Sequence, residues 1–231
     1  MLALALAVGC NDGARSPGGQ PAGQPTASAV PEAGAAVRFL ALGDSFTIGT
    51  GATPERSFPA RLAARWRTSS CLLTLENVAV NGFTTDDVIT VELPHLATFH
   101  PTFVTVAIGA NDIVRGTSDA DYRANVRRIL DAAKGTGARV VALPQPDWSR
   151  SPAAASFGTP EALAARITRF NAVLTEEARA TNAEWVDLVP LMQEQARRGD
   201  LASDGLHPSA SAYDAWAMEL ARVLTSPCAG Q

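Results

Sequence analysis

Four short clusters of polar residues carry the groups that nucleophilic catalysis needs. In chain order they are Gly43-Asp44-Ser45, Asn81-Gly82, Gly109-Ala110-Asn111-Asp112 and Asp204-Gly205-Leu206-His207. A serine hydroxyl is a poor nucleophile near neutral pH, so a base must take its proton during attack. Of the three histidines, only His207 has an aspartate three positions before it. The clusters therefore indicate a serine activated by a histidine whose ring Asp204 orients.

The same clusters hold donors for a second requirement of acyl chemistry. Attack on an ester carbonyl leaves negative charge on oxygen, and donors are needed where that charge develops. Candidates are the backbone N–H groups of Ser45 and Gly82 and the side-chain amide of Asn111. Taken singly, each cluster also has a purely structural interpretation, since Ser45 or Asp204 with His207 could cap a helix and Asn111 could satisfy a turn.

The elements around these clusters predict an α/β fold. Short apolar stretches rich in β-branched or aromatic residues predict strands over 37–42, 72–78, 103–108, 139–143 and 184–187. Helical periodicity predicts helices over 58–66, 85–96, 122–133, 161–180 and 209–224. Strands that alternate with helices indicate a parallel sheet covered on both faces, a three-layer sandwich. Ligand sites of such sheets lie beyond the carboxyl ends of the strands, where the polar clusters are expected to converge.

This ordered set of clusters resembles the SGNH hydrolases, also called the GDSL esterases and lipases. The similarity runs from Val37 to Leu224 and includes all four sequence blocks in order. It implies a flavodoxin-like parallel sheet of about five strands with helices on both faces. It also implies Ser45 as the nucleophile, Asp204 and His207 as the rest of a triad, and Gly82 and Asn111 as oxyanion-hole residues beside the Ser45 N–H. The activity implied is hydrolysis of carboxylic esters through an acyl-enzyme, without a cofactor.

Aromatic and aliphatic residues near the clusters are candidates for the substrate pocket. Phe46, Phe83 and Ile113 directly follow catalytic clusters, while Trp148 and Phe157 lie in a long loop after the fourth predicted strand. Such loops shape ligand pockets. An apolar rim favours an ester with a short to medium acyl chain.

Two other functions stay open. Aromatic side chains also stack on sugars, so the substrate could be a glycan ester, with acetyl groups removed from an envelope or extracellular polysaccharide. The chain could instead be a non-catalytic surface binding module on an esterase scaffold. The intact set of Ser45, Asn111, Asp204 and His207 argues against the module.

Other polar residues have structural interpretations. Asp44 and Asp112 are predicted to hold loops by hydrogen bonds to nearby backbone N–H groups. His95 and His100 are interpreted as surface or packing residues rather than a metal site.

Composition limits the classes of partner. The 231 residues are 46% hydrophobic and 18% charged, which suits one ordinary globular domain, here assigned to residues 37–231. Nineteen basic residues against 23 acidic ones give a net charge of −4, and the basic residues are scattered. We therefore expect no nucleic-acid partner.

The first 36 residues differ from the rest. Residues 1–10 are apolar, end in small residues and Cys10, and resemble the end of a bacterial lipoprotein signal. This predicts export with a membrane tether through lipidated Cys10, or otherwise a secreted or periplasmic protein; the alternative is a short buried element with an incidental cysteine. Residues 11–36 are dominated by Gly, Pro, Ala, Ser and Gln, which predicts a flexible linker.

The remaining cysteines suggest a cross-link. In an exported protein, Cys71 and Cys228 could form a disulfide that ties the C-terminal tail to the body. Two unpaired thiols are the alternative, because pairing requires Cα atoms within about 7 Å of each other.

Overall fold

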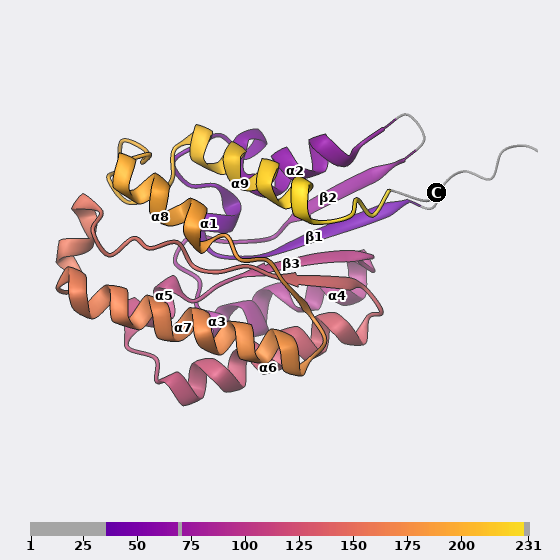
Figure 1. Cartoon of the computed structure of the whole chain (residues 1–231). Coiled ribbons are helices and arrows are strands. Elements are labelled where there is room, and N and C mark those ends of the chain that lie inside the picture. The colour runs from indigo at the N-terminus through magenta and orange to yellow at the C-terminus, as the bar shows by residue number, and fades with distance from the viewer. Residues whose placement is uncertain (1–35, 69–70, 229–231) are drawn as a thin grey trace, which may run out of the picture. The chain divides into compact units, whose positions relative to one another are not determined.

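The computed structural model describes residues 36–68 and 71–228, so the predictions for Cys10, the signal-like segment and the linker up to residue 35 lie outside the described residues. The described chain forms a five-stranded parallel sheet with helices around it (Figure 1). Its strands are β1 (Val37–Gly43), β2 (Leu73–Asn77), β3 (Phe103–Ala107), β4 (Arg139–Ala142) and β5 (Glu184–Trp185). The predicted three-layer α/β fold is confirmed.

The order of the strands fixes where a ligand can bind. That order is β2-β1-β3-β4-β5, so the chain leaves β1 toward one edge of the sheet and then crosses to β3 on the other side of β1. The carboxyl ends of β1 and β3 flank this switch point, which is where flavodoxin-like sheets bind ligands. Every residue of β3 is buried, as expected of a central parallel strand with both faces covered.

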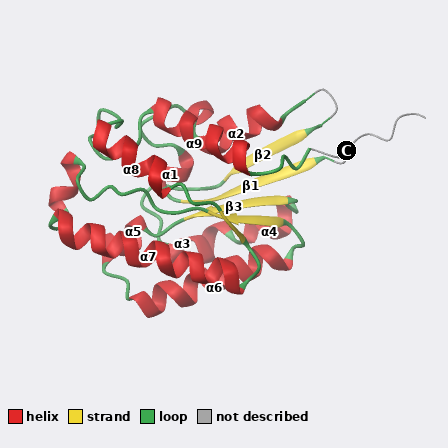
Figure 2. Ribbon diagram, in the orientation of Figure 1, coloured by secondary structure: helices red, strands yellow, loops and turns green. Residues whose placement is uncertain are grey.

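Helices cover both faces of the sheet (Figure 2). On one face, α2 (Phe58–Trp66) packs against α9 (Ala210–Val223), and the rings of Phe58 and Trp216 meet between them. The other face is covered by α4 (Pro94–Phe99), α6 (Asp119–Gly135) and α7 (Pro160–Ala180), as Figure 1 shows. Among the described helices, none is long and apolar enough to cross a membrane.

The predicted helix over 85–96 is divided in the structure. It consists of α3 (Thr85–Asp87), a π-helical turn η2 (Val88–Glu92) and α4. Pro94 has no N–H for the helical hydrogen-bond ladder, so it is accommodated at the start of a new helix after the wider turn.

Short elements connect the main ones. Two 3-10 turns, η1 (Pro54–Arg56) and η3 (Pro152–Ser156), begin with proline. The helices α1 (Ser45–Ile48), α5 (Ala110–Arg115) and α8 (Val189–Arg198) were not predicted from periodicity. The fifth strand is two residues long rather than four, because the Asp187 carboxylate accepts the Val189 N–H and turns the chain into α8.

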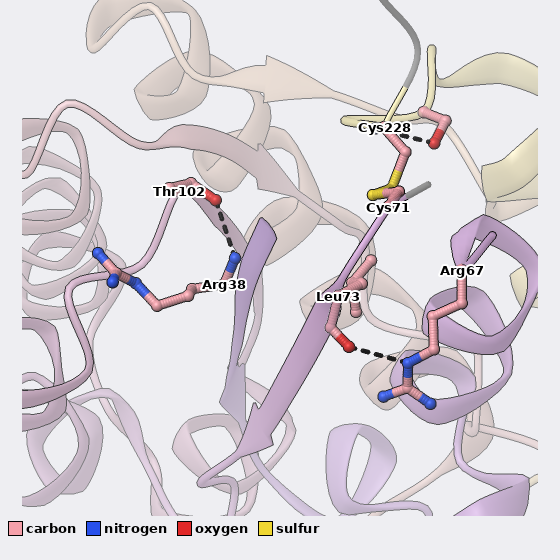
Figure 3. The surroundings of a disulfide bond; sticks show 7 residues. Arg38, Arg67, Cys71, Leu73, Thr102 and Cys228 are labelled. Atoms are coloured by element: carbon pink, nitrogen blue, oxygen red, sulfur yellow. Dashed lines mark hydrogen bonds between the residues drawn. A yellow bond between two sulfur atoms is a disulfide. The ribbon is translucent and has the colours of Figure 1, made fainter. Parts of the chain in front are cut away.

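A disulfide lies at the amino-terminal ends of the strands, the amino edge of the sheet. Cys71, two residues before β2, is bonded to Cys228, with their Cα atoms 5.6 Å apart (Figure 3). The Cys228 N–H donates to Ser226 Oγ at 3.1 Å, and the Arg67 side chain donates to the Leu73 carbonyl at 2.9 Å. The bond joins residues 157 positions apart at the edge opposite the polar clusters.

Candidate active site

The turn after β1 presents Ser45. Asp44 caps the N-terminus of α1, and its Oδ1 accepts the Phe46 N–H at 3.0 Å. Ser45 is the first helical residue, so its own N–H has no acceptor within the helix. A Cβ at Gly43 would lie 2.3 Å from the Ala107 carbonyl oxygen, so only glycine lets the end of β1 come this close to β3.

Asp204 and His207 form a hydrogen-bonded pair on the loop before α9. His207 Nδ1 lies 2.8 Å from Asp204 Oδ2, while Asp204 Oδ1 accepts the N–H groups of Leu206 at 2.9 Å and His207 at 3.0 Å. An ionised carboxylate can only accept, so Nδ1 carries a proton, and in the neutral ring the lone pair then lies on Nε2. Partial burial raises the pKa of Asp204, but the hydrogen bonds from Leu206 and His207 outweigh it and hold that pKa below its ordinary value.

Ser45, Asn111 and His207 line one small cavity. Its volume is about 120 Å³. The remaining lining residues are Phe46, Ala110, Val114, Trp148, Phe157 and Leu206. The structure thus brings together three of the predicted site residues from the ends of β1 and β3 and from the loop before α9.

Asn111 and Gly82 are held differently. The Asn111 amide donates one hydrogen to the Phe83 carbonyl at 2.9 Å, which leaves its second hydrogen for another acceptor. Gly82 has a φ of 82°, in the left-handed region, and its carbonyl accepts from the Arg115 guanidinium at 2.9 Å. Gly82 is not among the residues that line the small cavity.

The five predicted pocket residues separate into two groups. Phe46, Trp148 and Phe157 line the small cavity, but Phe83 and Ile113 do not. Ile113 is 5% exposed and belongs to the hydrophobic core. Successive helical residues point about 100° apart, and in α5 this turns the next residue, Val114, toward the cavity instead. Phe83 contributes its backbone carbonyl, which Asn111 binds.

Three buried carboxyl groups lie close to the nucleophile turn. The Asp112 carboxylate accepts the Thr85 N–H at 2.9 Å and the Thr85 hydroxyl at 2.6 Å, and Glu92 Oε2 accepts the Gly43 N–H at 2.9 Å. The prediction that Asp44 and Asp112 hold loops by bonds to backbone N–H groups is confirmed.

Glu92 was not predicted as a site residue. It lies on the apolar stripe of Val88, Ile89 and Leu96, where an acidic residue does not fit the pattern.

Burial changes the protonation of this group. Removal from water raises the pKa of Asp44 to about 7, with a smaller contribution from the nearby Asp112 charge. Burial likewise raises the pKa of Glu92 to about 9, and the Asp44 charge adds to it. Burial also raises the pKa of Asp112. Glu92 is therefore neutral at pH 7 and adds no further charge beside Asp44.

The other two histidines lie elsewhere. His95 is partly exposed and its Nδ1 lies 2.6 Å from Glu76 Oε1, and His100 is an exposed residue that ends α4 with a φ of 49°. Neither lines the small cavity, in agreement with their interpretation as surface residues.

Comparison with known proteins gives the family. Residues 41–215 match the family model described as "GDSL-like Lipase/Acylhydrolase family". The chain belongs to this family. It is accordingly a GDSL-type, or SGNH, carboxylic ester hydrolase.

Curated relatives agree with this assignment, and solved structures share the fold. The chain is 27% identical over 183 residues to "Thioesterase 1/protease 1/lysophospholipase L1" of Escherichia coli K12, covering 78% of this chain and 79% of that protein. It is 32% identical over 108 residues to an "Arylesterase" of Vibrio mimicus, covering 46% of this chain and about half, 54%, of the relative. The crystal structure of TesA superposes with a TM-score of 0.64 at 24% identity, covering 81% of this chain and 99% of that one, and so shares its fold.

Proposed function

We propose that this protein is a serine esterase that hydrolyses carboxylic esters through a triad of Ser45, His207 and Asp204. The observation that carries the proposal is the place of His207, whose Nδ1 lies 2.8 Å from Asp204 Oδ2 and which lines the same cavity as Ser45. A neutral imidazole that donates from Nδ1 has its lone pair on Nε2, which is the group that a serine hydroxyl needs as a base.

The reaction follows from these positions. Ser45 Oγ attacks the ester carbonyl carbon while His207 Nε2 takes the hydroxyl proton. The tetrahedral intermediate then loses its alcohol, which leaves with the proton from His207, and Ser45 carries the acyl group. Water attacks this acyl-enzyme, gives its proton to His207 and releases the carboxylic acid as Ser45 regains its proton.

Stabilisation of the oxyanion falls to the N–H of Ser45, the free amide hydrogen of Asn111 and the N–H of Gly82. The first two belong to residues that line the cavity, and the Phe83 carbonyl fixes the Asn111 amide beforehand. Donors oriented before the reaction need no reorganisation as the charge develops. Gly82 stands on the neighbouring loop and enters the site on the family resemblance alone.

The cavity supports a short acyl chain. At about 120 Å³ it is smaller than the 300–1,000 Å³ typical of pockets for drug-sized ligands, and most of its lining is apolar. We propose that small-molecule esters of short to medium acyl chains are the substrates, ahead of acetylated glycans.

Hydrolysis of p-nitrophenyl esters from acetate to palmitate tests the proposal. We expect turnover to peak among the short chains, and Ser45→Ala to lower kcat by roughly 10⁶-fold while the melting temperature stays near that of the wild type. Retention of more than a tenth of the activity by folded Ser45→Ala would place the nucleophile elsewhere. A folded wild type that cleaves acetylated polysaccharide but no p-nitrophenyl ester would favour the deacetylase instead.

We also propose that the protein is exported and tethered by lipid on Cys10. The cysteine at the end of the signal-like stretch supports this, and the Cys71–Cys228 bond suits an oxidising compartment. In a bacterial host, the precursor should incorporate labelled palmitate and sediment with membranes, and Cys10→Ala should do neither. An unlabelled wild type found only in the soluble fraction would contradict the tether.

A further inference from the structure

A second, larger cavity lies beside the Ser45 cavity. Its volume is about 340 Å³, and it is lined by the loop after β4, helices α8 and α9, and the loop that carries Asp204 and His207. Its apolar lining residues include Met192, Leu201 and Trp216, and polar residues such as Asp147, Arg150 and Asp200 complete it. Neither Ser45 nor His207 lines this cavity, so the reaction as derived above does not use it.

The two cavities share part of their lining. Phe46, Trp148 and Leu206 line both of them and are called the partition here. Phe46 and Trp148 are each 4% exposed. The Phe46 ring packs against the His207 ring with centroids 5.3 Å apart, and Trp148 meets Phe157 edge to face at 6.1 Å. The partition is therefore buttressed from the side of the small cavity.

Trp148 is the partition residue whose buried polar group lacks a hydrogen bond. Its indole N–H is buried and has no acceptor among the described residues. A buried donor without a partner makes a site less stable than one with its hydrogen bonds satisfied. Phe46 follows the nucleophile directly, and Leu206 donates its N–H to the Asp204 carboxylate. Trp148 is thus the partition residue that can be changed with least disturbance of the triad.

The two volumes differ in what they can hold. A cavity of roughly 150 Å³ is filled by benzene, so about 120 Å³ holds an acyl group of fewer than about six carbons. The larger cavity, at about 340 Å³, falls within the 300–1,000 Å³ range that holds larger ligands. Together they offer room for a medium to long acyl chain, and the partition is the part of the lining that the two cavities share.

We propose that Phe46, Trp148 and Leu206 set the upper limit of acyl-chain length, and that the larger cavity is a latent compartment for the far end of a longer acyl chain. This inference rests on the proposed function, since the limit concerns the acyl group delivered to Ser45. It assigns Trp148 as a specificity-determining residue.

Removal of the Trp148 side chain tests the limit. The ratio of kcat/KM for p-nitrophenyl octanoate to that for p-nitrophenyl butanoate is measured for the wild type and Trp148→Ala. Each newly buried methylene favours binding by about a factor of four, so we expect the ratio to rise at least tenfold over the four added methylenes. Trp148→Phe keeps a ring in the partition and should keep the ratio near the wild-type value.

Met192→Ala is the matched control. Met192 is buried and lines the larger cavity without being part of the partition, so its truncation enlarges that cavity and leaves the barrier in place. We expect its octanoate-to-butanoate ratio to stay within about twofold of the wild type. A wild type that prefers octanoate, or a folded Trp148→Ala with an unchanged ratio, would overturn the proposal.

A binding experiment keeps this test separate from the proposed function. If the wild type hydrolyses no ester, titration calorimetry with 1-octanol and 1-butanol decides in the Ser45→Ala background. The proposal predicts that Ser45→Ala with Trp148→Ala binds 1-octanol at least tenfold more tightly than Ser45→Ala does, with 1-butanol little changed. Equal octanol affinities would overturn the latent compartment, whatever the outcome for activity.

Discussion

The amino-terminal and carboxyl-terminal ends of the strands, here called the amino edge and the carboxyl edge of the sheet, are stabilised differently. At the amino edge, Arg139 pairs with Glu184 through its Nε at 2.5 Å and also donates to the Thr225 carbonyl, and Cys71 is bonded to Cys228. At the carboxyl edge, Asp44 and Glu92 are buried, and each keeps one carboxyl oxygen without a partner in the described part of the chain. The amino edge is stabilised by an ion pair and a covalent bond, while the carboxyl edge holds buried acids and the cavities.

This difference separates stability from chemistry. A cross-link between residues 157 positions apart restricts the unfolded chain and touches none of the groups around Ser45. The carboxyl edge instead keeps groups whose burial opposes folding, as functional sites commonly do. Changes at the carboxyl edge should therefore alter activity first, and changes at the amino edge should alter stability first.

The largest expected effect is on activity at the carboxyl edge. Asp204→Asn keeps the shape of the side chain but replaces an acceptor with an amide that can also donate, so His207 is no longer fixed in the tautomer that leaves Nε2 free. We expect kcat on a short ester to fall by about 10⁴-fold at pH 7. Ser203→Ala, at the exposed neighbouring position, is the control and should retain wild-type kcat. Equal activities of the two variants would remove Asp204 from the triad.

The next effect concerns the oxyanion. Asn111→Ala removes one of the hydrogen-bond donors that line the cavity and stabilise the developing charge. We expect kcat to fall by about 10²–10³-fold with little change in KM. Steady-state kinetics on a short p-nitrophenyl ester measure both constants. A rise in KM at constant kcat would show instead that Asn111 binds the ground state.

At the amino edge the order of effects should reverse. Replacement of both Cys71 and Cys228 by serine should lower the free energy of unfolding by about 2–4 kcal/mol and leave kcat within about twofold of the wild type. Urea unfolding and ester hydrolysis of the same preparations measure the two quantities. A loss of activity in the folded double variant would show that the disulfide also affects the active site, and would contradict the separation of stability from chemistry.

The last expected effect is a dependence of stability on pH, with no change in the chemistry at Ser45. Because burial raises the pKa of Glu92 from 4.5 to about 9, its contribution to stability is fully present below pH 4.5 and is lost as the pH rises through about 9. Glu92→Gln keeps an acceptor for the Gly43 N–H and cannot ionise, so its unfolding free energy should fall less than that of the wild type between pH 5 and pH 9.

Urea unfolding across this pH range measures the difference. The exposed Glu161→Gln variant is the control and should follow the wild-type curve. Parallel curves for Glu92→Gln and the wild type would show that Glu92 does not carry the raised pKa.

Sequence predicted the fold well because strands and helices alternate with strong apolar periodicity. The strands were located to within about two residues, and the elements that were missed are short or begin at polar turns, as α1 and α5 do. In the π-helical turn before Pro94 local backbone geometry overrode the periodic pattern. The position of Asp204 three residues before His207 led to a pair that the structure holds at 2.8 Å.

The parts that sequence could not predict depend on three-dimensional direction. Ile113 and Val114 are neighbours of similar chemistry, and only the orientation of α5 decides that Val114 lines the cavity. The partition of Phe46, Trp148 and Leu206 joins three segments that are far apart in the chain. Glu92 offered a signal, an acid on an apolar stripe, but its contact with the Gly43 N–H required the structure.

Covalent labelling of the nucleophile tests the central claim most directly. The wild type is treated with an activated alkyl phosphonate ester, which reacts with a serine that a neighbouring base has activated, and the labelled peptide is identified by mass spectrometry. The triad predicts one phosphonate per chain, located on Ser45, with labelling slowed strongly in Asp204→Asn and absent in Ser45→Ala. A label on another residue, or undiminished labelling of Ser45→Ala, would contradict it.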